Sequence, residues 1–293
     1  MSRYLLHSVS YAGFWGQAYL GVDDFVLKAA ELGYDGVMLM AKRPHLSVLD
    51  YGEKERAALR QALEKAKLKH VVLAGYTNLT ADMEHGEIPQ REIQTQYMVE
   101  LAKLAHDIGA SAVRVFTGYD NPAADYGKQW KLIADTLRET ATRYAEYGVV
   151  LGVQNHHDMC VGYETMHDLI RTVNHPNCQA MFDAWAPALH GDDVEKAAKR
   201  MAPMTVHTTV ADYQLRPRFR YNAQLVNYEK QTAFVQAVPM GEGFIDYKGF
   251  FRGLKKGGFD GTVSYEMCSQ LADGGELATL DRYARRFLEY VKK

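Results

Sequence analysis

The stretch ELGYDGVMLM, residues Glu31–Met40, joins the end of an amphipathic helical segment to a short β-rich run through a glycine. The same arrangement returns at Asp107–Phe116, Glu146–Val153 and Lys256–Tyr265. Glycine favours the left-handed position just past a helix C-terminus, and continuous apolar runs are typical of parallel strands buried on both faces. These copies predict repeated helix-to-strand connections, and hence an α/β fold with a parallel sheet.

Working outward from these copies, we count eight β-rich runs that alternate with helical segments of 3.6-residue periodicity. The runs are Leu5–Val9, Val37–Met40, Val71–Ala74, Ala112–Phe116, Val149–Val153, Ala180–Phe182, Thr205–Val206 and Thr262–Tyr265. The helical segments are roughly 22–32, 53–67, 93–108, 128–147, 162–173, 194–201, 246–256 and 277–291. This is the count of a (β/α)8 TIM barrel. A doubly wound sheet is the alternative, but no Gly-x-Gly-x-x-Gly follows the first run.

Composition sets the wider limits. The chain has 293 residues, 47% of them hydrophobic and 24% charged, with a formal net charge of −2. A chain of this length and composition can bury a large core. Its near-neutral charge argues against a nucleic-acid partner. No apolar run reaches the roughly 18 residues that span a membrane, and Met1–His7 lacks a signal peptide's apolar segment. Three cysteines without a CxxC pair favour a reducing compartment, so we expect a cytoplasmic protein.

No shift in composition marks a linker, so residues 1–293 are predicted to form one TIM-barrel domain. The longest non-periodic stretch, roughly 210–243, is polar and aromatic. We expect it to be a long loop after the seventh strand, which closes over a ligand or makes an oligomer contact.

Four consecutive strands are each predicted to end in a polar side chain: Gln154, Asp183, His207 and Glu266. In a barrel, the carboxyl ends of the strands gather round one mouth. Amide, carboxylate and imidazole groups are ligands for Mn²⁺, Mg²⁺ or Co²⁺, so these four residues are predicted to hold one divalent metal. Three of them have an ordinary alternative: a helix N-cap for Asp183, a core histidine for His207 and an arginine partner for Glu266.

The segment GVVLGVQNHH, Gly148–His157, resembles the G-V-x-L-x-x-E-N-H strand of the xylose-isomerase-like sugar isomerase/epimerase superfamily, which includes D-tagatose 3-epimerase and inosose dehydratase. Met240–Asp246 is similar to that family's G-x-G-x-I-D turn. The resemblance covers nearly the whole chain and implies a TIM barrel. It also implies one metal that chelates vicinal oxygens of a ketose, and carboxylates that move protons on the two faces of the sugar.

The sequence departs from this family at Gln154, where the family has Glu. An amide oxygen can coordinate a metal but cannot act as a Brønsted base, so we expect weaker metal affinity and a missing base on that face. His156 or His157 would then abstract the proton, together with Glu266 as the remaining acid–base group. The alternative is that one of the two histidines packs inside and the other only supports its neighbours.

Sugar contacts are expected from the remaining loops, at His45, Tyr76, Trp185, His190 and Arg218, with Lys42, Arg43 and Arg114 as further basic candidates. A solvated basic face is the alternative for the charged ones.

The predicted function is a metal-dependent sugar isomerase or epimerase that removes a proton beside the carbonyl of a sugar or oxo-sugar. The alternatives are a lyase acting on oxidised sugars, by deglycosidation of 3-oxo-glycosides or dehydration of an inosose, and a non-catalytic sugar-binding subunit. A homo-oligomer is expected, and resemblance to the larger subunit of C-glycoside deglycosidases implies a small partner subunit as another arrangement.

Overall fold

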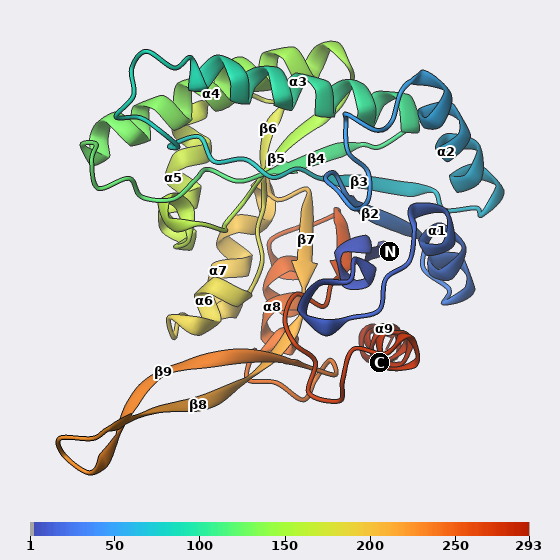
Figure 1. Ribbon diagram of the computed structural model, residues 1–293. Helices are drawn as coiled ribbons and strands as arrows, with labels where there is room; N and C mark the ends of the chain where they lie inside the picture. The colour runs from blue at the N-terminus through green and yellow to red at the C-terminus, as the bar shows by residue number, and fades with distance from the viewer. Residues whose placement is uncertain (1–2, 293) are drawn as a thin grey trace.

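The computed structural model describes residues 3–292, and eight parallel strands form its centre (Figure 1). These are β1 (Arg3–His7), β2 (Gly36–Met40), β3 (His70–Ala74), β4 (Ala112–Val115), β5 (Val150–Gln154), β6 (Cys178–Met181), β7 (His207–Val210) and β10 (Thr262–Tyr265). They pair in the order β6-β5-β4-β3-β2-β1-β10-β7. A parallel bridge between Ala180 and Thr205 joins the two ends of the sheet. The predicted (β/α)8 barrel is confirmed.

Helices connect the strands and lie outside them (Figure 1). They are α1 (Val22–Glu31), α2 (Glu53–Lys65), α3 (Gln90–Ile108), α4 (Tyr126–Glu146), α5 (Tyr163–Val173), α6 (Trp185–Leu189), α7 (Val194–Met201), α8 (Tyr247–Lys256) and α9 (Leu277–Val291). All but the short α6 were predicted, because each carries an apolar stripe that packs on the strands. Within residues 3–292, no helix is long and apolar enough to cross a membrane.

The core has two layers. Outside the barrel, a large cluster of buried apolar side chains lies between strands and helices. Inside it, a small cluster fills the space between the strands: Leu5, Met38, Val72, Ala74, Ala112 and Met181. Gly152 makes room for this inner packing, since a Cβ there would lie 2.3 Å from Met181 Cε. The barrel interior is therefore filled mainly by apolar side chains, although a few polar ones such as Arg114 on β4 and His207 on β7 are buried with them.

Two strand ends differ from the prediction. β1 stops at His7 because the 3-10 helix η1 (Ser8–Tyr11) follows at once. β7 is the run His207–Val210, not Thr205–Val206. The prediction that the seventh strand ends at His207 is wrong: His207 begins it and pairs in register with Thr262, the first residue of β10. The β-branched residues that follow His207 are buried in this ladder, as strand residues are.

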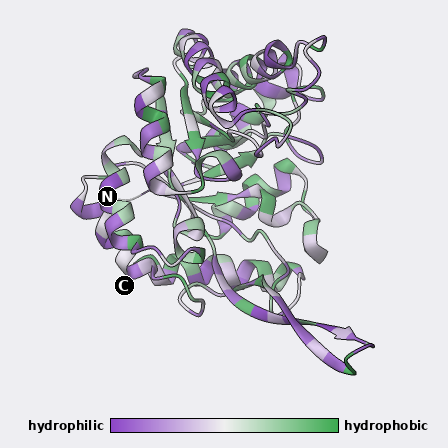
Figure 2. Ribbon diagram, turned by 90° about the vertical axis from the view of Figure 1, so that its left-hand side faces the viewer, coloured by the Kyte–Doolittle hydropathy of each residue, from purple (hydrophilic) through white to green (hydrophobic). Residues whose placement is uncertain are grey.

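The long segment expected after the seventh strand, at 210–243, is present, but it is not an irregular loop. It holds an antiparallel hairpin of β8 (Asp212–Asn222) and β9 (Asn227–Val238). The hairpin extends away from the barrel, with hydrophilic and hydrophobic residues mixed along it (Figure 2). Pro217 lies where the pairing register shifts between Arg216 and Arg218, which suits a residue that has no N–H to donate to a ladder.

Candidate active site

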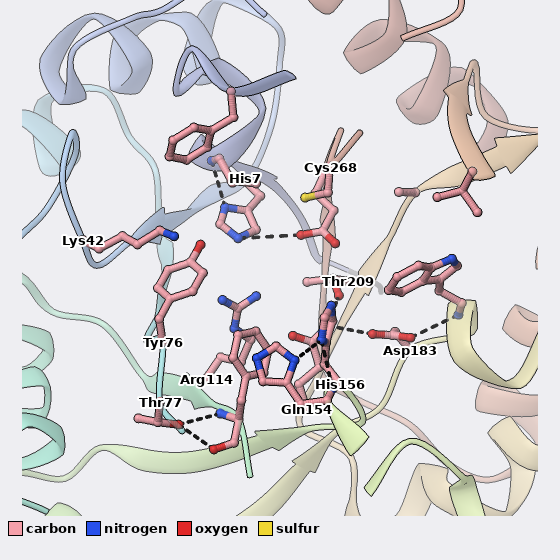
Figure 3. A pocket seen from close by; sticks show the side chains of 18 of the residues that line it. His7, Lys42, Tyr76, Thr77, Arg114, Gln154, His156, Asp183, Thr209 and Cys268 are labelled. Carbon is pink, nitrogen blue, oxygen red and sulfur yellow. Dashed lines mark hydrogen bonds and ion pairs between the residues drawn. The ribbon is translucent and has the colours of Figure 1, made fainter. Parts of the chain in front are cut away.

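A cavity of about 820 Å³ opens at the carboxyl ends of the barrel strands. Each of the eight strands, or the segment directly after it, supplies a polar lining residue: His7, Lys42, Tyr76, Arg114, Gln154, Asp183, Thr209 and Glu266 (Figure 3). This volume lies within the range of roughly 300–1,000 Å³ typical of small-molecule sites. The residues that the barrel brings together here come from almost the whole length of the chain.

Most of the residues predicted from the sequence line this cavity. They are Gln154, His156, His157, Asp183, Glu266, Tyr76 and Trp185. His207, His45, His190 and Arg218 do not line it.

Two of these four are histidines held in the core. His207 is buried at the start of β7, and its Nδ1 lies 2.6 Å from Thr262 Oγ1. Burial lowers its pKa to about 3. His45 is also buried, with Nδ1 3.0 Å from Ser8 Oγ and Nε2 3.0 Å from the Leu20 carbonyl oxygen. Both nitrogens of His45 have a partner, whereas His207 Nε2 is buried without one. His207 is corrected as a metal ligand because it starts β7 and does not line the cavity, and His45 is corrected as a sugar contact.

The other two lie on the surface. His190 is exposed and follows the C-terminus of α6. Arg218 is exposed on the hairpin strand β8, beyond the part that reaches the cavity. The solvated alternative holds for both of them.

Asp183 is fixed by its neighbours. Gln154 Nε2 donates to Asp183 Oδ2 at 2.6 Å and to Thr209 Oγ1 at 2.8 Å. The Trp185 N–H donates to Asp183 Oδ1 at 3.1 Å, and the side chain of Asn155 bonds both backbone groups of Asp183. Burial raises the pKa of Asp183 to about 7. This carboxylate is held in one orientation by amide donors.

Glu266 is in a different environment. It follows β10, and no N–H or O–H group within residues 3–292 donates a hydrogen bond to its carboxylate. Its hydrogen-bonding neighbour is the Cys268 thiol, and burial raises the pKa of Glu266. His7 Nε2 lies 3.7 Å from Glu266 Oε2. The Val9 N–H donates to His7 Nδ1 at 3.2 Å, so the ring proton is on Nε2 and points toward Glu266. Burial lowers the pKa of His7 well below its ordinary value, so this contact joins a neutral ring to a carboxylate.

His156 and His157 form a pair. Their Nδ1 atoms lie 2.7 Å apart, and the His157 backbone N–H donates to His156 Nδ1 at 3.0 Å. With its Nδ1 accepting, neutral His156 carries its proton on Nε2. Burial lowers the pKa of His156 to about 3 and that of His157 to about 4. In this tautomer His156 is a proton donor to the cavity, and the predicted base role does not fit it.

Arg114 brings a positive charge into the cavity. It lies on β4, it is only 4% exposed, and its guanidinium carbon is 4.8 Å from the Tyr76 ring and 4.3 Å from the Phe116 ring. Its Nη2 donates to the Gly75 carbonyl oxygen at 3.3 Å, while Nε has no partner. Among the described residues no carboxylate lies within 4.0 Å of it.

The chain is similar in sequence and in fold to known proteins. Residues 26–290 match the family described as xylose isomerase-like TIM barrel. The chain belongs to this family. It is 22% identical over 283 residues to the fructoselysine 3-epimerase of Escherichia coli O157:H7, covering 94% of both chains. It is 23% identical over 255 residues to the rhizopine catabolism protein MocC of Rhizobium meliloti, covering 80% of this chain and 71% of the relative.

Solved structures share the fold of this xylose isomerase-like barrel. D-psicose 3-epimerase with D-tagatose, from Clostridium cellulolyticum H10, superposes with a TM-score of 0.77 at 15% identity, covering 99% of this chain and 98% of that one. The probable 3-DHS dehydratase AsbF of Bacillus anthracis superposes with a TM-score of 0.74 at 16% identity, covering 100% and 99%.

The donor set of this xylose isomerase-like chain does not fit the predicted divalent metal. His207 starts its strand, and the position two residues further along β7, which does line the cavity, is Thr209. Gln154 turns its amide nitrogen to Asp183, which leaves its neutral amide oxygen, buried without a hydrogen-bond partner, as a weaker ligand than a carboxylate. Within residues 3–292, no group of three or more His, Cys, Asp or Glu side chains is placed to hold a metal ion.

Sequence reasoning missed His7 and Thr209 as lining residues. Both lie at or near the carboxyl ends of their strands, β1 and β7, and both were hidden by the misplaced strand ends. Arg114 was predicted only as one of several basic sugar contacts. Arg114 differs from the other basic candidates because it lies within a buried strand. Arginine is rarely buried, so this position is a sign of function.

Proposed function

We propose that this chain is an enzyme that moves a proton at the carbon beside the carbonyl of a sugar or oxo-sugar, as an isomerase or epimerase. The family and its epimerase relatives support the reaction class. The observation that carries the proposal is the contrast between two carboxylates in one cavity. Asp183 is held by donors on both oxygens, whereas Glu266 is bound by no N–H or O–H group of residues 3–292 and faces the open space.

Glu266 is the general base in this scheme. Its oxygen takes the proton from carbon, and the C–H electron pair forms the C=C bond of an enediolate while negative charge moves onto the former carbonyl oxygen. Two neutral rings, His7 and His156, present Nε2–H groups to the same cavity. One of them returns a proton to oxygen or to the opposite face of the carbon. Asp183 and Gln154, which their own hydrogen bonds hold in place, orient the sugar.

A lyase acting on an oxo-sugar is the second candidate, and Gln154 favours it. Epimerisation through two carboxylates needs a base on each face, and the amide of Gln154 cannot accept a proton. β-Elimination needs one base: Glu266 removes the proton, the C–H electron pair forms the C=C bond, and the bond to the leaving oxygen or carbon breaks as that atom takes the bonding electrons and a proton from His7 or His156. The structural likeness to a probable dehydratase supports considering this outcome.

Incubation in D₂O tests the proposal and separates the two candidates. The wild-type chain is mixed with free ketoses, fructoselysine, inososes and 3-oxo-glucosides, and products are read by NMR and mass spectrometry. Isomerisation or epimerisation places solvent deuterium on the carbon beside the carbonyl; elimination releases water or the aglycone. Glu266→Gln should abolish either reaction, and the surface variant Glu289→Gln should not. If no compound of the panel exchanges or breaks down, the chain is the non-catalytic sugar-binding subunit instead.

A further inference from the structure

We propose that Arg114 supplies the positive charge that this cavity uses to hold the anionic oxygens of an enediolate, so that the site works without a divalent metal. The inference rests on the proposed function, because the enediolate is the anion that removal of the carbon-bound proton creates. It goes beyond that function by naming the residue that stabilises this anion and by removing the metal from the chemistry.

The cavity lining contains both negative and positive side chains. The lining includes the carboxylates of Asp183 and Glu266. It also includes two cations, Arg114 and Lys42, which share the ring of Tyr76: Lys42 Nζ lies 4.1 Å and the Arg114 guanidinium carbon 4.8 Å from its centre. Burial raises the pKa of both carboxylates and the charge of Arg114 lowers it in part, so a sugar bound here meets a base and a fixed positive charge in the same cavity. That is the arrangement that proton abstraction beside a carbonyl requires.

Arg114 is a cation that the fold buries without satisfying. It is 4% exposed, its Nε has no partner, and the hydrogen bond from Nη2 goes to a neutral carbonyl at 3.3 Å. Burying a charge without an ion partner costs several kcal/mol. A chain that keeps such a residue in its barrel interior gains from it elsewhere, and an anionic ligand in the cavity would satisfy the free N–H groups.

The position of Arg114 is fixed by its surroundings. Its partner in register on β5 is Gly152, which adds no side chain beside it. The rings of Tyr76 and Phe116 lie against the guanidinium, and in Figure 3 it points into the open part of the cavity above Gln154. A planar fork of N–H donors held in this way suits the two adjacent oxygens of a cis-enediolate.

The first test measures metal and anion binding directly. Glycolohydroxamate is the probe, because its planar O–C–N–O group has the shape and charge of an enediolate. Metal-free wild-type chain in EDTA is titrated by calorimetry, then again with Mn²⁺ in excess. We expect binding in EDTA, a dissociation constant that Mn²⁺ leaves unchanged, and no stoichiometric Mn²⁺, Co²⁺ or Mg²⁺ uptake. Binding that needs a metal, or no binding in EDTA at all, overturns the proposal.

The second test uses Arg114→Met and Arg114→Lys. Loss of charge-assisted hydrogen bonds should weaken hydroxamate binding by about 10- to 100-fold in Arg114→Met, with a smaller loss in Arg114→Lys and none in the hairpin control Arg218→Met. The melting temperature of Arg114→Met should change little, because replacing a buried cation by an apolar side chain offsets the loss of the Gly75 hydrogen bond and of the charge that favours ionised Asp183 and Glu266. Unchanged affinity in a folded Arg114→Met, or a lowered melting temperature that Arg114→Lys restores, would show a merely structural role.

The two proposals fail separately. Hydroxamate binding in EDTA with no deuterium exchange in the substrate panel refutes the proposed reaction and leaves the anion site standing. Deuterium exchange that disappears in EDTA and returns with Mn²⁺ supports the reaction and refutes the role given to Arg114.

Discussion

The amide nitrogen of Gln154 lies 2.6 Å from a carboxylate oxygen of Asp183 and 2.8 Å from the hydroxyl of Thr209. Replacing the amide by a carboxylate removes the N–H donor to Asp183, leaves Thr209 to turn and donate its O–H instead, and brings two buried acids together. We therefore expect Gln154→Glu to lower the free energy of unfolding by about 2–3 kcal/mol at pH 7. Urea denaturation measures this. The matched control Gln179→Glu, at a partly exposed position on β6, should change stability by less than about 0.5 kcal/mol.

A double variant tests the donor-set argument from the other direction. Gln154→Glu with Thr209→His gives the cavity three carboxylates and one imidazole together with Asp183 and Glu266. Such a set suits Mn²⁺, so Mn²⁺ should restore the lost stability and raise the melting temperature of this variant only. Equal stabilisation of the wild-type chain by Mn²⁺ would mean that Gln154 and Thr209 already complete a metal site.

His45 should matter for stability and not for substrate. Its ring joins Ser8 Oγ to the Leu20 carbonyl oxygen at 3.0 Å each. His45→Leu removes both hydrogen bonds and leaves Ser8 Oγ with only the Met40 N–H as a partner, and it should cost about 2–3 kcal/mol at pH 7.5 by chemical denaturation. The exposed His85→Leu serves as control, with an expected change below about 0.5 kcal/mol. A stable His45→Leu with weakened sugar binding would restore His45 as a sugar contact.

The cost of His45→Leu should also depend on pH. Burial lowers the pKa of His45 below 6.5, so the folded chain keeps the ring neutral where the unfolded chain already binds a proton. Wild-type stability therefore falls as pH drops below 6.5, by up to about 1.4 kcal/mol per pH unit for this one proton. The variant lacks this loss. The difference between the two should shrink between pH 6.5 and pH 5; a constant difference contradicts the assigned shift.

The fold could be predicted because parallel strands buried on both faces leave a plain mark: a glycine after a helix, then a short apolar run, as in Gly33 and Val37–Met40. The sequence indicates the ends of the strands less clearly. Thr205–Val206 and His207–Val210 are both short runs rich in β-branched residues, and no periodicity decides between them. The choice between these two runs decides which side chain is predicted at the rim of the barrel. The prediction placed His207 there, whereas the structure places Thr209.

The residues of the site could be predicted only where the ends of the strands were placed correctly. Asp183 and Glu266 follow runs whose ends were placed correctly to within a residue, so both were found. His7 and Thr209 were lost with the ends of β1 and β7. That Arg114 is buried without an ion partner depends on what surrounds it in space, and no local pattern in the sequence records this.

Gly36 should be irreplaceable although it lies far from the chemistry. A Cβ at this position on β2 would stand 1.9 Å from the carbonyl oxygen of His70 on β3. Gly36→Ala must push two paired strands apart, and we expect it to lower the free energy of unfolding by about 3 kcal/mol or to prevent folding. The control is Gly86→Ala, where a Cβ would meet nothing within 4 Å. Equal stability of the two variants would contradict the close approach of β2 and β3.

The hairpin should be dispensable for folding. Most side chains between residues 214 and 234 are exposed, and an isolated two-stranded hairpin adds little stability in water. Replacing 217–233 by Asn-Gly joins the register pair Arg216 and Phe234 through a two-residue turn and keeps Tyr213 and Val235, which line the cavity. We expect the free energy of unfolding, measured in urea, to change by less than about 1 kcal/mol. A larger loss that depends on protein concentration would mean that the hairpin packs against a second copy of the chain, since only an intermolecular contact is sensitive to dilution.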